Sequence, residues 1–396
     1  MIVNLLRVKW NYIVTFFLVA FTNIYITSIT SLSPAYIGIV LAPISLILFC
    51  NKESIKKRQQ TNELVVLVFS FLVYLLISCA ITGNFNDVFF YINYFFYNHF
   101  VFIIALFYLQ HCNLYQLKRI IKLLFIFSTI IFFIDFIWRV THSINQFKGL
   151  LAFYNFKFNS LMFLDSNWPG FMSMLVFSLL VYLADNKLIT NKKYLWISFV
   201  SVLLTLSRAA IVCCIIVILF SKFIKLSKKL RIYISFVGIP IVFAGMIYIL
   251  TNLLDSSFLS KLELLKGMYY YLTHFGINNL LFGNYPDANH DNVIFMNTWI
   301  GGHLYMTRYI DFGFMACFFE FFFLLVIMIF TKFKSLYLVI PFFIAGLSFC
   351  PWNVPYFYIE LAIIYVIENK LYTEKLSPSN ISINFKRTIY YIFKYN

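Results

Sequence analysis

The stretch IKLLFIFSTIIFFIDFIW, residues 121–138, is apolar on every face when it is wound as an α-helix, and its only charged residues are Lys122 and Asp135. A helix of this length is about 27 Å long at about 1.5 Å per residue, close to the roughly 30 Å of a bilayer's hydrocarbon core. Similar apolar stretches recur along all 396 residues. Because an open sheet would leave backbone groups unpaired in lipid, the sequence predicts membrane-spanning helices.

The pattern predicts an all-α, polytopic integral membrane protein, a single domain over residues 1–396 with about twelve transmembrane helices. The expected spans lie near residues 11–30, 35–50, 64–82, 89–109, 121–138, 168–184, 194–206, 209–221, 232–251, 312–330, 335–350 and 355–367. We expect residues 194–221 to form two short spans, because one long helix would carry the basic residues between 222 and 231 to the outer face.

Composition and charge agree with a membrane location. Of the residues in the chain, 62% are apolar and 12% are charged, whereas about a quarter of the residues in soluble domains are charged. Lys and Arg number 31 against 15 Asp and Glu, and an orientation with both termini in the cytoplasm places 24 of the 31 inside. Topology thus accounts for the net charge of +16, and no nucleic-acid partner is expected. The basic residues left outside are Arg139, Lys148, Lys157, Arg208, Lys261, Lys266 and Arg308.

The polar residues concentrate in two long outer segments, residues 139–167 and the larger loop 252–311, and loops of this length usually carry function. Segment 368–396 is expected to be a cytoplasmic tail. The cysteines lie in or beside apolar stretches and indicate neither disulfides nor a metal site. Motifs that bind nucleotides or their metals are absent from the sequence, so neither cofactor nor metal is predicted. A few ionisable residues are scattered singly within the expected spans: His99, Asp135, Glu320 and Glu360.

Arg208 lies in the sharpest local feature, LTLSRAA at residues 204–210. The spans on either side reach only about 20 Å each, so the turn at Ser207 and Arg208 is expected in a recess below the outer surface. Arginine binds phosphate oxygens bidentately, and lipid pyrophosphates place their headgroup at this level. The alternative is an arginine that snorkels at a helix end or pairs with an acidic neighbour.

A second feature, DSNWPG at residues 165–170, precedes the sixth expected span. Asn167 is a good N-cap residue and Pro169 suits a first helical turn, so a structural role is sufficient. The functional alternative is a helix N-terminus that faces an anionic headgroup.

The third feature closes the large loop, where His290 and Asp291 are followed by His303 and Arg308 just ahead of an expected span. A neutral histidine beside a cation has its pKa pushed down, which suits a general base that accepts a proton from a sugar hydroxyl. A lone loop histidine is more often only a surface polar residue, so the prediction depends on the cluster.

Through these residues and the expected spans, the chain resembles the O-antigen polymerases and ligases of Gram-negative bacteria. Those proteins have about a dozen spans, one large periplasmic loop late in the chain and a T-x-S-R-[GA] signature between two helices. Residues 205–209, Thr-Leu-Ser-Arg-Ala, match that signature. The family also tends to show His, or Asp-Asn, about ten residues before a Gly that opens the next helix, and His303 and Gly313 fit this spacing. A rival alignment pairs His290 with Gly301, as in ligases, but a polar stretch follows Gly301.

The resemblance implies metal-independent glycosyl transfer, without a cofactor, at the periplasmic face of the bacterial inner membrane. A polymerase of this family moves the growing glycan from its undecaprenyl pyrophosphate carrier onto a fresh lipid-linked repeat unit. The partner would be an undecaprenyl-pyrophosphate-linked oligosaccharide, and a membrane protein that regulates chain length is a candidate second partner. The alternatives are an O-antigen ligase, which transfers the glycan to lipid A core, and a lipid-linked oligosaccharide flippase.

The same resemblance implies roles for the residues singled out above. His303 or His290 would activate the acceptor hydroxyl for direct displacement, and Arg208 would neutralise the departing pyrophosphate. The residues implied to bind the substrate or its pyrophosphate are Arg208, Arg308, Arg139, Asn167 and Asp291.

Overall fold

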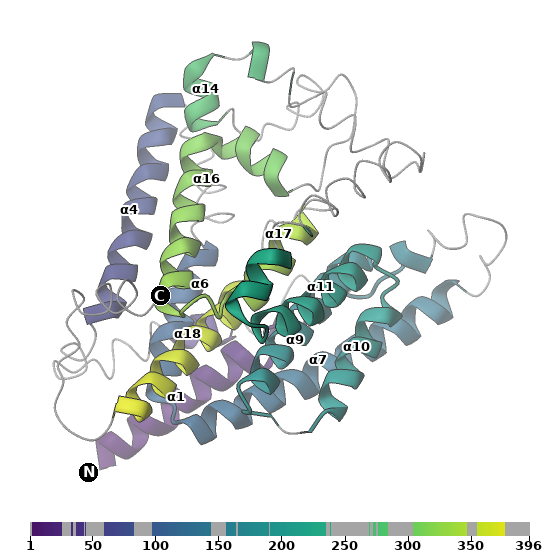
Figure 1. Cartoon of the computed structure of the whole chain (residues 1–396). Coiled ribbons are helices and arrows are strands. Elements are labelled where there is room, and N and C mark those ends of the chain that lie inside the picture. Colours follow the sequence, from purple (N-terminus) through teal and green to yellow (C-terminus); the bar gives the residue numbers. More distant parts are fainter. Residues whose placement is uncertain are drawn as a thin grey trace.

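The computed structural model describes residues 2–25, 33–34, 37–42, 44, 59–82, 97–143, 156–163, 165–189, 191–234, 238, 269, 272–274, 276–283, 304–346 and 355–376. Over these residues the chain is all-helical and contains no β-strand (Figure 1). The helices are α1 (Ile2–Ala20), α4 (Gln59–Thr82), α6 (Tyr97–His111), α7 (Leu114–Ser143), α9 (Asn167–Asp185), α10 (Lys193–Leu204), α11 (Arg208–Ile224), α14 (Ile277–Phe282), α16 (Leu304–Phe330), α17 (Leu336–Gly346) and α18 (Pro355–Leu376).

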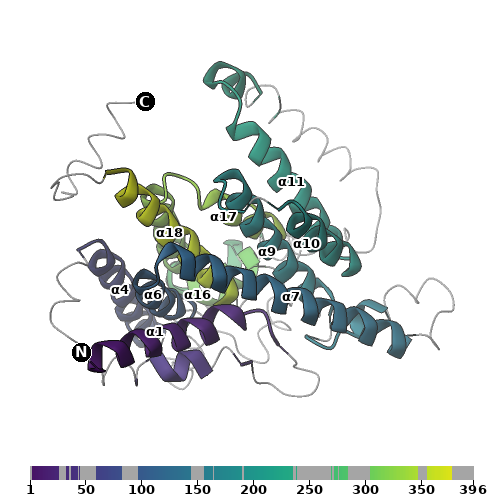
Figure 2. The same ribbon diagram turned by 90° about the horizontal axis from the view of Figure 1, so that it is seen from below.

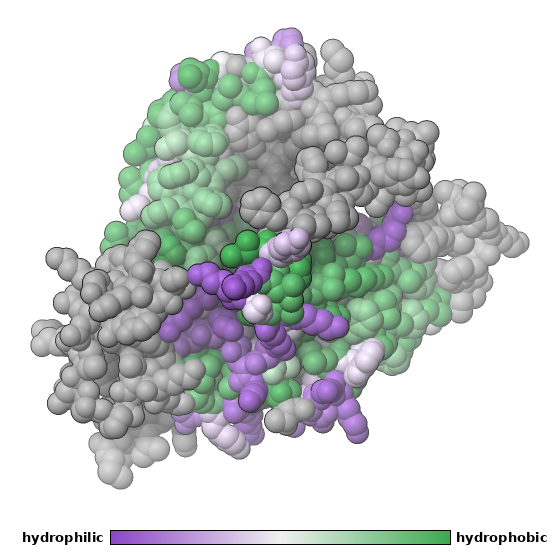
Figure 3. Space-filling model, viewed as in Figure 1, coloured by the Kyte–Doolittle hydropathy of each residue, from purple (hydrophilic) through white to green (hydrophobic). Residues whose placement is uncertain are grey.

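Within this described part, three helices are long and apolar enough to cross a membrane: α7, α9 and the portion of α16 from Gly313 to Phe330. Shorter apolar helical stretches are Trp10–Ala20, Leu64–Ser78, Lys193–Leu204 and Leu336–Gly346. Large apolar side chains such as Phe69 of α4 and Phe318 of α16 are exposed. Figure 3 shows hydrophobic residues covering the side of the molecule formed by α4 and α16. Extensive exposed apolar surface of this kind is stable against lipid rather than water.

Several expected spans have different limits in the structure. Helix α1 ends at Ala20 and residues 21–23 form a turn, so residues 11–30 are not one helix. Helix α7 extends beyond residues 121–138 at both ends. Helix α18 continues to Leu376, nine residues into the expected tail, and the rest of 368–396 lies outside the described residues. The expected spans 35–50, 89–109 and 232–251 also fall partly outside them.

Helix α9 is the central element of the bundle. It lies among α7, α10, α11, α17 and α18 and contacts each of them (Figure 2), and its residues from Pro169 to Leu183 are all buried. An α-helix that is apolar on every face can be surrounded in this way. Its Ser173 and Ser178 hydroxyls donate to the carbonyl oxygens of Gly170 and Met174 in the same helix, so their burial leaves no polar group unpaired. The surrounding helices therefore hold the N-terminal end of α9 in place.

Helix α16 contains a sharp kink at Gly313, whose φ of 77° and ψ of 174° are accessible almost only to glycine. A Cβ atom at this position would lie 2.5 Å from the backbone nitrogen of Gly283 and would overlap the carbonyl oxygen of Leu281. The short helix α14 thus packs directly against the kink, and Ser78 of α4 donates to the carbonyl of Phe282 at 2.9 Å. The apolar portion of α16 runs from Gly313 to Phe330 on one side of the kink, so the prediction that an apolar helix begins at this glycine is confirmed.

Two of the ionisable residues expected to be scattered singly are in fact joined by one tyrosine. The Tyr358 hydroxyl donates to Glu320 at 2.6 Å, and the Tyr358 ring lies 5.1 Å from the His99 ring. Asp135 also has a buried partner, Arg139. The Asp135–Arg139 pair could have been read from the sequence, because the two residues are four apart on one helix. Sequence spacing could not reveal that Tyr358 joins Glu320 and His99, because that approach depends on how the helices pack.

Candidate functional site

The break between α10 and α11 is a tight turn at residues 205–207, which confirms that residues 194–221 form two helices. The Thr205 hydroxyl donates to the carbonyl of Val202 at 2.7 Å and accepts from the backbone N–H of Ser207 at 3.3 Å. Leu206 between them has a φ of 56°, an uncommon conformation for a residue with a bulky side chain. Thr205 and Ser207 are buried, while Leu206 and Arg208 are exposed. The turn therefore presents the Arg208 side chain outward from a fixed base.

The N-terminal end of α9 lies directly against this turn. A Cβ atom at Gly170 would lie 2.6 Å from Cβ of Ser207 and 2.9 Å from Oγ1 of Thr205. Glycine is needed here because the side chains of Thr205 and Ser207 occupy the space that a Cβ atom would take. Helices α9 and α11 both begin beside this contact, at Asn167 and Arg208. The N-terminus of a helix carries a partial positive charge, so two such ends meet at one place.

Arg139 of α7 joins this turn to the long helix behind it. Its Nε donates to Asp135 at 2.8 Å and its Nη2 donates to the carbonyl oxygen of Leu204, the last residue of α10, at 3.0 Å. The last carbonyls of a helix lack intrahelical partners, so the guanidinium satisfies one of them. The guanidinium also lies 4.8 Å from the centre of the Phe156 ring, within the range of a cation–π contact. The side chain is 0% exposed, and its Nη1 has no hydrogen-bond partner among the described residues.

Asp135 extends the same network to the segment before α9. Its Oδ1 accepts from the Ser160 hydroxyl at 2.7 Å and from the backbone N–H of Leu161 at 2.8 Å. With the Arg139 bond, the buried carboxylate accepts three donors, which offsets its desolvation. Residues 156–163 are thereby fixed to α7.

Lys157 lies in this segment, and its Nζ donates to the side-chain oxygen of Asn167 at 3.1 Å. Burial is the main reason that its pKa lies below the ordinary lysine value, and the positive charges of Arg208 and Arg139 lower it further, against the opposing effect of Asp165. An added negative charge beside Lys157 would therefore stabilise the protonated form of this lysine. We call Arg139, Lys157 and Arg208, with Asp135 and Asp165, the cationic cluster.

The expected role of Asn167 as an N-cap is wrong. The N-cap of α9 is Ser166, which makes no capping bond with its side chain and whose buried Oγ has no partner among the described residues. Asn167 is the first helical residue, and its backbone N–H and side-chain amide donate to Asp165 at 2.9 and 3.1 Å. The Asp165 carboxylate thus takes the Asn167 side-chain amide in a local hydrogen bond of the kind typical of Asp and Asn, and Asn167 does not cap the helix.

The structure brings together three of the residues singled out from the sequence, Arg139, Asn167 and Arg208. The sequence predicts Lys157 only as an outer basic residue. Its position in the outer segment 139–167, together with Arg139 and Asn167, is the signal that points to its place in the cluster. The backbone of Arg308 lies in the first part of α16, but its side chain is outside the described part. His303, His290 and Asp291 lie outside the described residues.

The cationic cluster can bind an anion with several oxygens. Three cations face two carboxylates, the exposed Arg208 can make bidentate bonds to phosphate, and two helix N-termini add positive potential. The buried pair of Arg139 and Asp135 is neutral overall and holds the turn in place. No known protein-family model matches the chain, and no curated protein is similar to it in sequence.

Proposed function

We propose that this protein is an O-antigen, or surface polysaccharide, polymerase of the bacterial inner membrane. In this proposal the chain crosses the membrane about twelve times with both termini in the cytoplasm. The reaction transfers the growing glycan from undecaprenyl pyrophosphate to a lipid-linked repeat unit at the periplasmic face. The observation that carries the proposal is the grouping of Arg139, Lys157 and Arg208 around the buried turn at residues 205–207.

The cluster supplies what the leaving group of this reaction requires. As the bond between the anomeric carbon and the pyrophosphate oxygen breaks, the electron pair and a negative charge stay on the pyrophosphate. Arg208 and Lys157 stabilise that charge at the moment when it develops, which is the most effective kind of electrostatic catalysis. Arg139 is a positioning residue, because its buried guanidinium fixes the end of α10 from which the turn extends.

The acceptor side of the reaction requires a base. The hydroxyl oxygen of the repeat unit forms the new bond to the anomeric carbon, and its proton passes to a histidine, His303 or His290. Asp291, and Arg308 in the first part of α16, contact the lipid-linked substrate in this proposal. Direct displacement requires no covalent intermediate on the enzyme and no metal.

The experiment expresses variants in a strain that lacks the chromosomal gene and compares glycan ladders on gels of its lipopolysaccharide. Arg208→Ala and Lys157→Ala should shorten or abolish the ladder, since one lost contact to a developing oxyanion lowers the rate by about 10²–10³-fold. Arg208→Lys should retain part of the activity, because lysine keeps the positive charge but lacks the paired N–H donors that bind phosphate bidentately. Arg119→Ala is the matched control, an exposed arginine near the other end of α7. Wild-type ladders from Arg208→Ala at equal protein level would refute the role of this residue.

The deletion strain separates the polymerase from the ligase. Core that carries a single repeat indicates a polymerase, whereas bare core with accumulated lipid-linked polymer indicates a ligase. Conversion of purified lipid-linked repeat to polymer by the purified chain would distinguish either enzyme from a flippase, which makes no glycosidic bond.

A further inference from the structure

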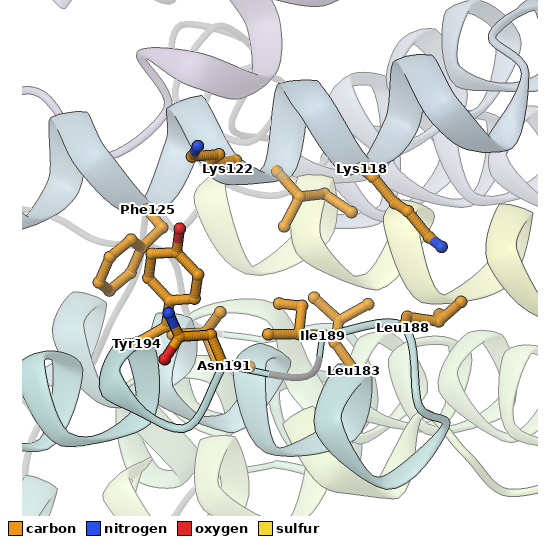
Figure 4. A pocket seen from close by; sticks show the side chains of 10 residues that line it. Lys118, Lys122, Phe125, Leu183, Leu188, Ile189, Asn191 and Tyr194 are labelled. Atoms are coloured by element: carbon orange, nitrogen blue, oxygen red, sulfur yellow. The ribbon is translucent and has the colours of Figure 1, made fainter.

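A pocket of about 310 Å³ opens between the N-terminal half of α7, the C-terminal end of α9 and the linker that leads to α10 (Figure 4). Figure 4 shows Lys118 reaching from α7 toward the side chains of Leu183, Leu188 and Ile189, while Lys122 lies along α7 above Phe125 and Tyr194. The rings of Phe125 and Tyr194 meet edge to face at 5.1 Å and close one end. The volume is at the lower end of the range of small-molecule sites, about 300–1,000 Å³.

The two lysines give the pocket a positive charge without a counter-charge. Lys118 and Lys122 are four residues apart on α7, so they lie on the same face and repel each other. Both are exposed, and neither has an ion pair or hydrogen bond with the described residues. The carboxylate at the end of α9, Asp185, is already occupied by Lys225, Ser221 and Tyr337. An anion between the lysines would relieve this repulsion.

The rest of the pocket suits a hydrocarbon chain. Leu180 and Leu183 of α9, Leu188 and Ile189 of the linker and Ile121 of α7 line it with aliphatic groups. A small hydrophilic anion gains nothing from such a lining, whereas an acyl chain buries apolar area there. Charge at the rim and aliphatic groups behind it are the arrangement that matches an anionic lipid.

The pocket lies at the opposite end of α7 from the cationic cluster. Lys122 and Arg139 are 17 residues apart on one helix, which is about 26 Å along its axis and close to the thickness of the hydrocarbon core. The linker between α9 and α10 adds the exposed lysines Lys187 and Lys192, and the exposed Lys193 begins α10. The proposed orientation places this end at the cytoplasmic leaflet, where anionic lipids attract basic segments.

We propose that this pocket is a binding site for an anionic phospholipid of the cytoplasmic leaflet. The phosphate lies between Lys118 and Lys122, and the upper part of one acyl chain lies against Leu183 and Ile189. The lipid fills the space between α7 and the end of α9 and fastens the two helices on the side opposite the cationic cluster. This inference rests on the proposed membrane orientation of the chain, and it does not depend on the polymerase activity.

Native mass spectrometry of the purified full chain in detergent tests the site with phosphatidylglycerol and phosphatidylcholine as probes. Wild type should bind phosphatidylglycerol more tightly than phosphatidylcholine. Lys118→Gln and Lys122→Gln should each weaken phosphatidylglycerol binding about five-fold, as expected for one charge near a lipid phosphate, and should weaken phosphatidylcholine binding less, because its choline cation offsets the phosphate charge. Arg119→Gln, which removes an adjacent exposed charge outside the pocket lining, should change it less than about two-fold.

Three results would overturn the proposal. The first is equal affinity of wild type for the two lipids. The second is a loss in Arg119→Gln as large as in the lysine variants, which would show general attraction to a basic surface. The third is displacement of the lipid by glycerol 3-phosphate at equal concentration, which would show a site for free phosphate without a chain. Failure of this test leaves the ladder experiment with Arg208→Ala unaffected, because the residues and readouts differ.

Discussion

Gly170→Ala should loosen the contact that holds the cationic cluster together. The new Cβ atom would lie 2.6 Å from Cβ of Ser207, whereas carbon atoms pack at about 3.5–4.0 Å, so the two backbones must separate by about 1 Å. Neither side moves easily, because α9 is buried from Pro169 to Leu183 and the turn is fixed by Arg139. Overpacking of this kind typically lowers the free energy of unfolding by about 1–3 kcal/mol.

Thermal unfolding of the purified chain measures this loss. An unfolding entropy of about 2.1 cal/mol/K per residue over 396 residues gives about 0.8 kcal/mol/K, so Tm should fall by about 1–4 °C. Gly238→Ala is the matched control, since its nearest neighbour beyond the adjacent residues is Cγ2 of Ile234 at an ordinary 3.7 Å. The same displacement moves Arg208, the residue after Ser207, so glycan ladders should also shorten.

A double-mutant cycle with Ser207→Gly tests the cause. Removing the Ser207 Cβ should restore part of the stability lost in Gly170→Ala, and only part, because Oγ1 of Thr205 still lies 2.9 Å from the new atom. A Gly170→Ala protein as stable as wild type, or a double variant whose losses simply add, would refute the close contact as the reason for glycine here.

Three other changes have outcomes that follow from the same geometry. Asp135→Asn leaves the buried Arg139 without its counter-charge and should lower the free energy of unfolding by about 3–5 kcal/mol in thermal unfolding, while addition of Arg139→Gln should recover part of it. Pyrophosphate affinity, measured by calorimetry, should fall as pH rises through the depressed pKa of Lys157, at a lower pH than for an ordinary lysine, and Lys157→Arg should remove that step. Gly313→Ala should destabilise the chain by at least about 1–3 kcal/mol, since φ is 77° and the backbone of Gly283 occupies the space, and an unchanged Tm would contradict this.

Local patterns of the sequence determined the class of structure and the position of its breaks. In lipid, the backbone N–H and C=O groups of continuous apolar stretches such as residues 121–138 have few ways to form hydrogen bonds. Helices could therefore be predicted without any knowledge of packing. The division at residues 205–207 was also predictable, because one long helix would carry the basic residues between 222 and 231 to the outer face. The start of an apolar helix at Gly313 was predictable from the apolar stretch that follows this glycine. The prediction for Asn167 was wrong because two local bonds compete there, and the sequence does not show which one is made.

Only the tertiary structure decided which polar residues meet. Arg139, Lys157 and Arg208 come from α7, an outer segment and α11, and no spacing along the chain relates them. Their approach is set by the central position of α9 and by Gly170, whose missing side chain lets the turn at residues 205–207 settle against the end of that helix. In a chain with few charges, each buried charge must find a partner. The packing of the helices, and not the order of residues, determines where those partners are.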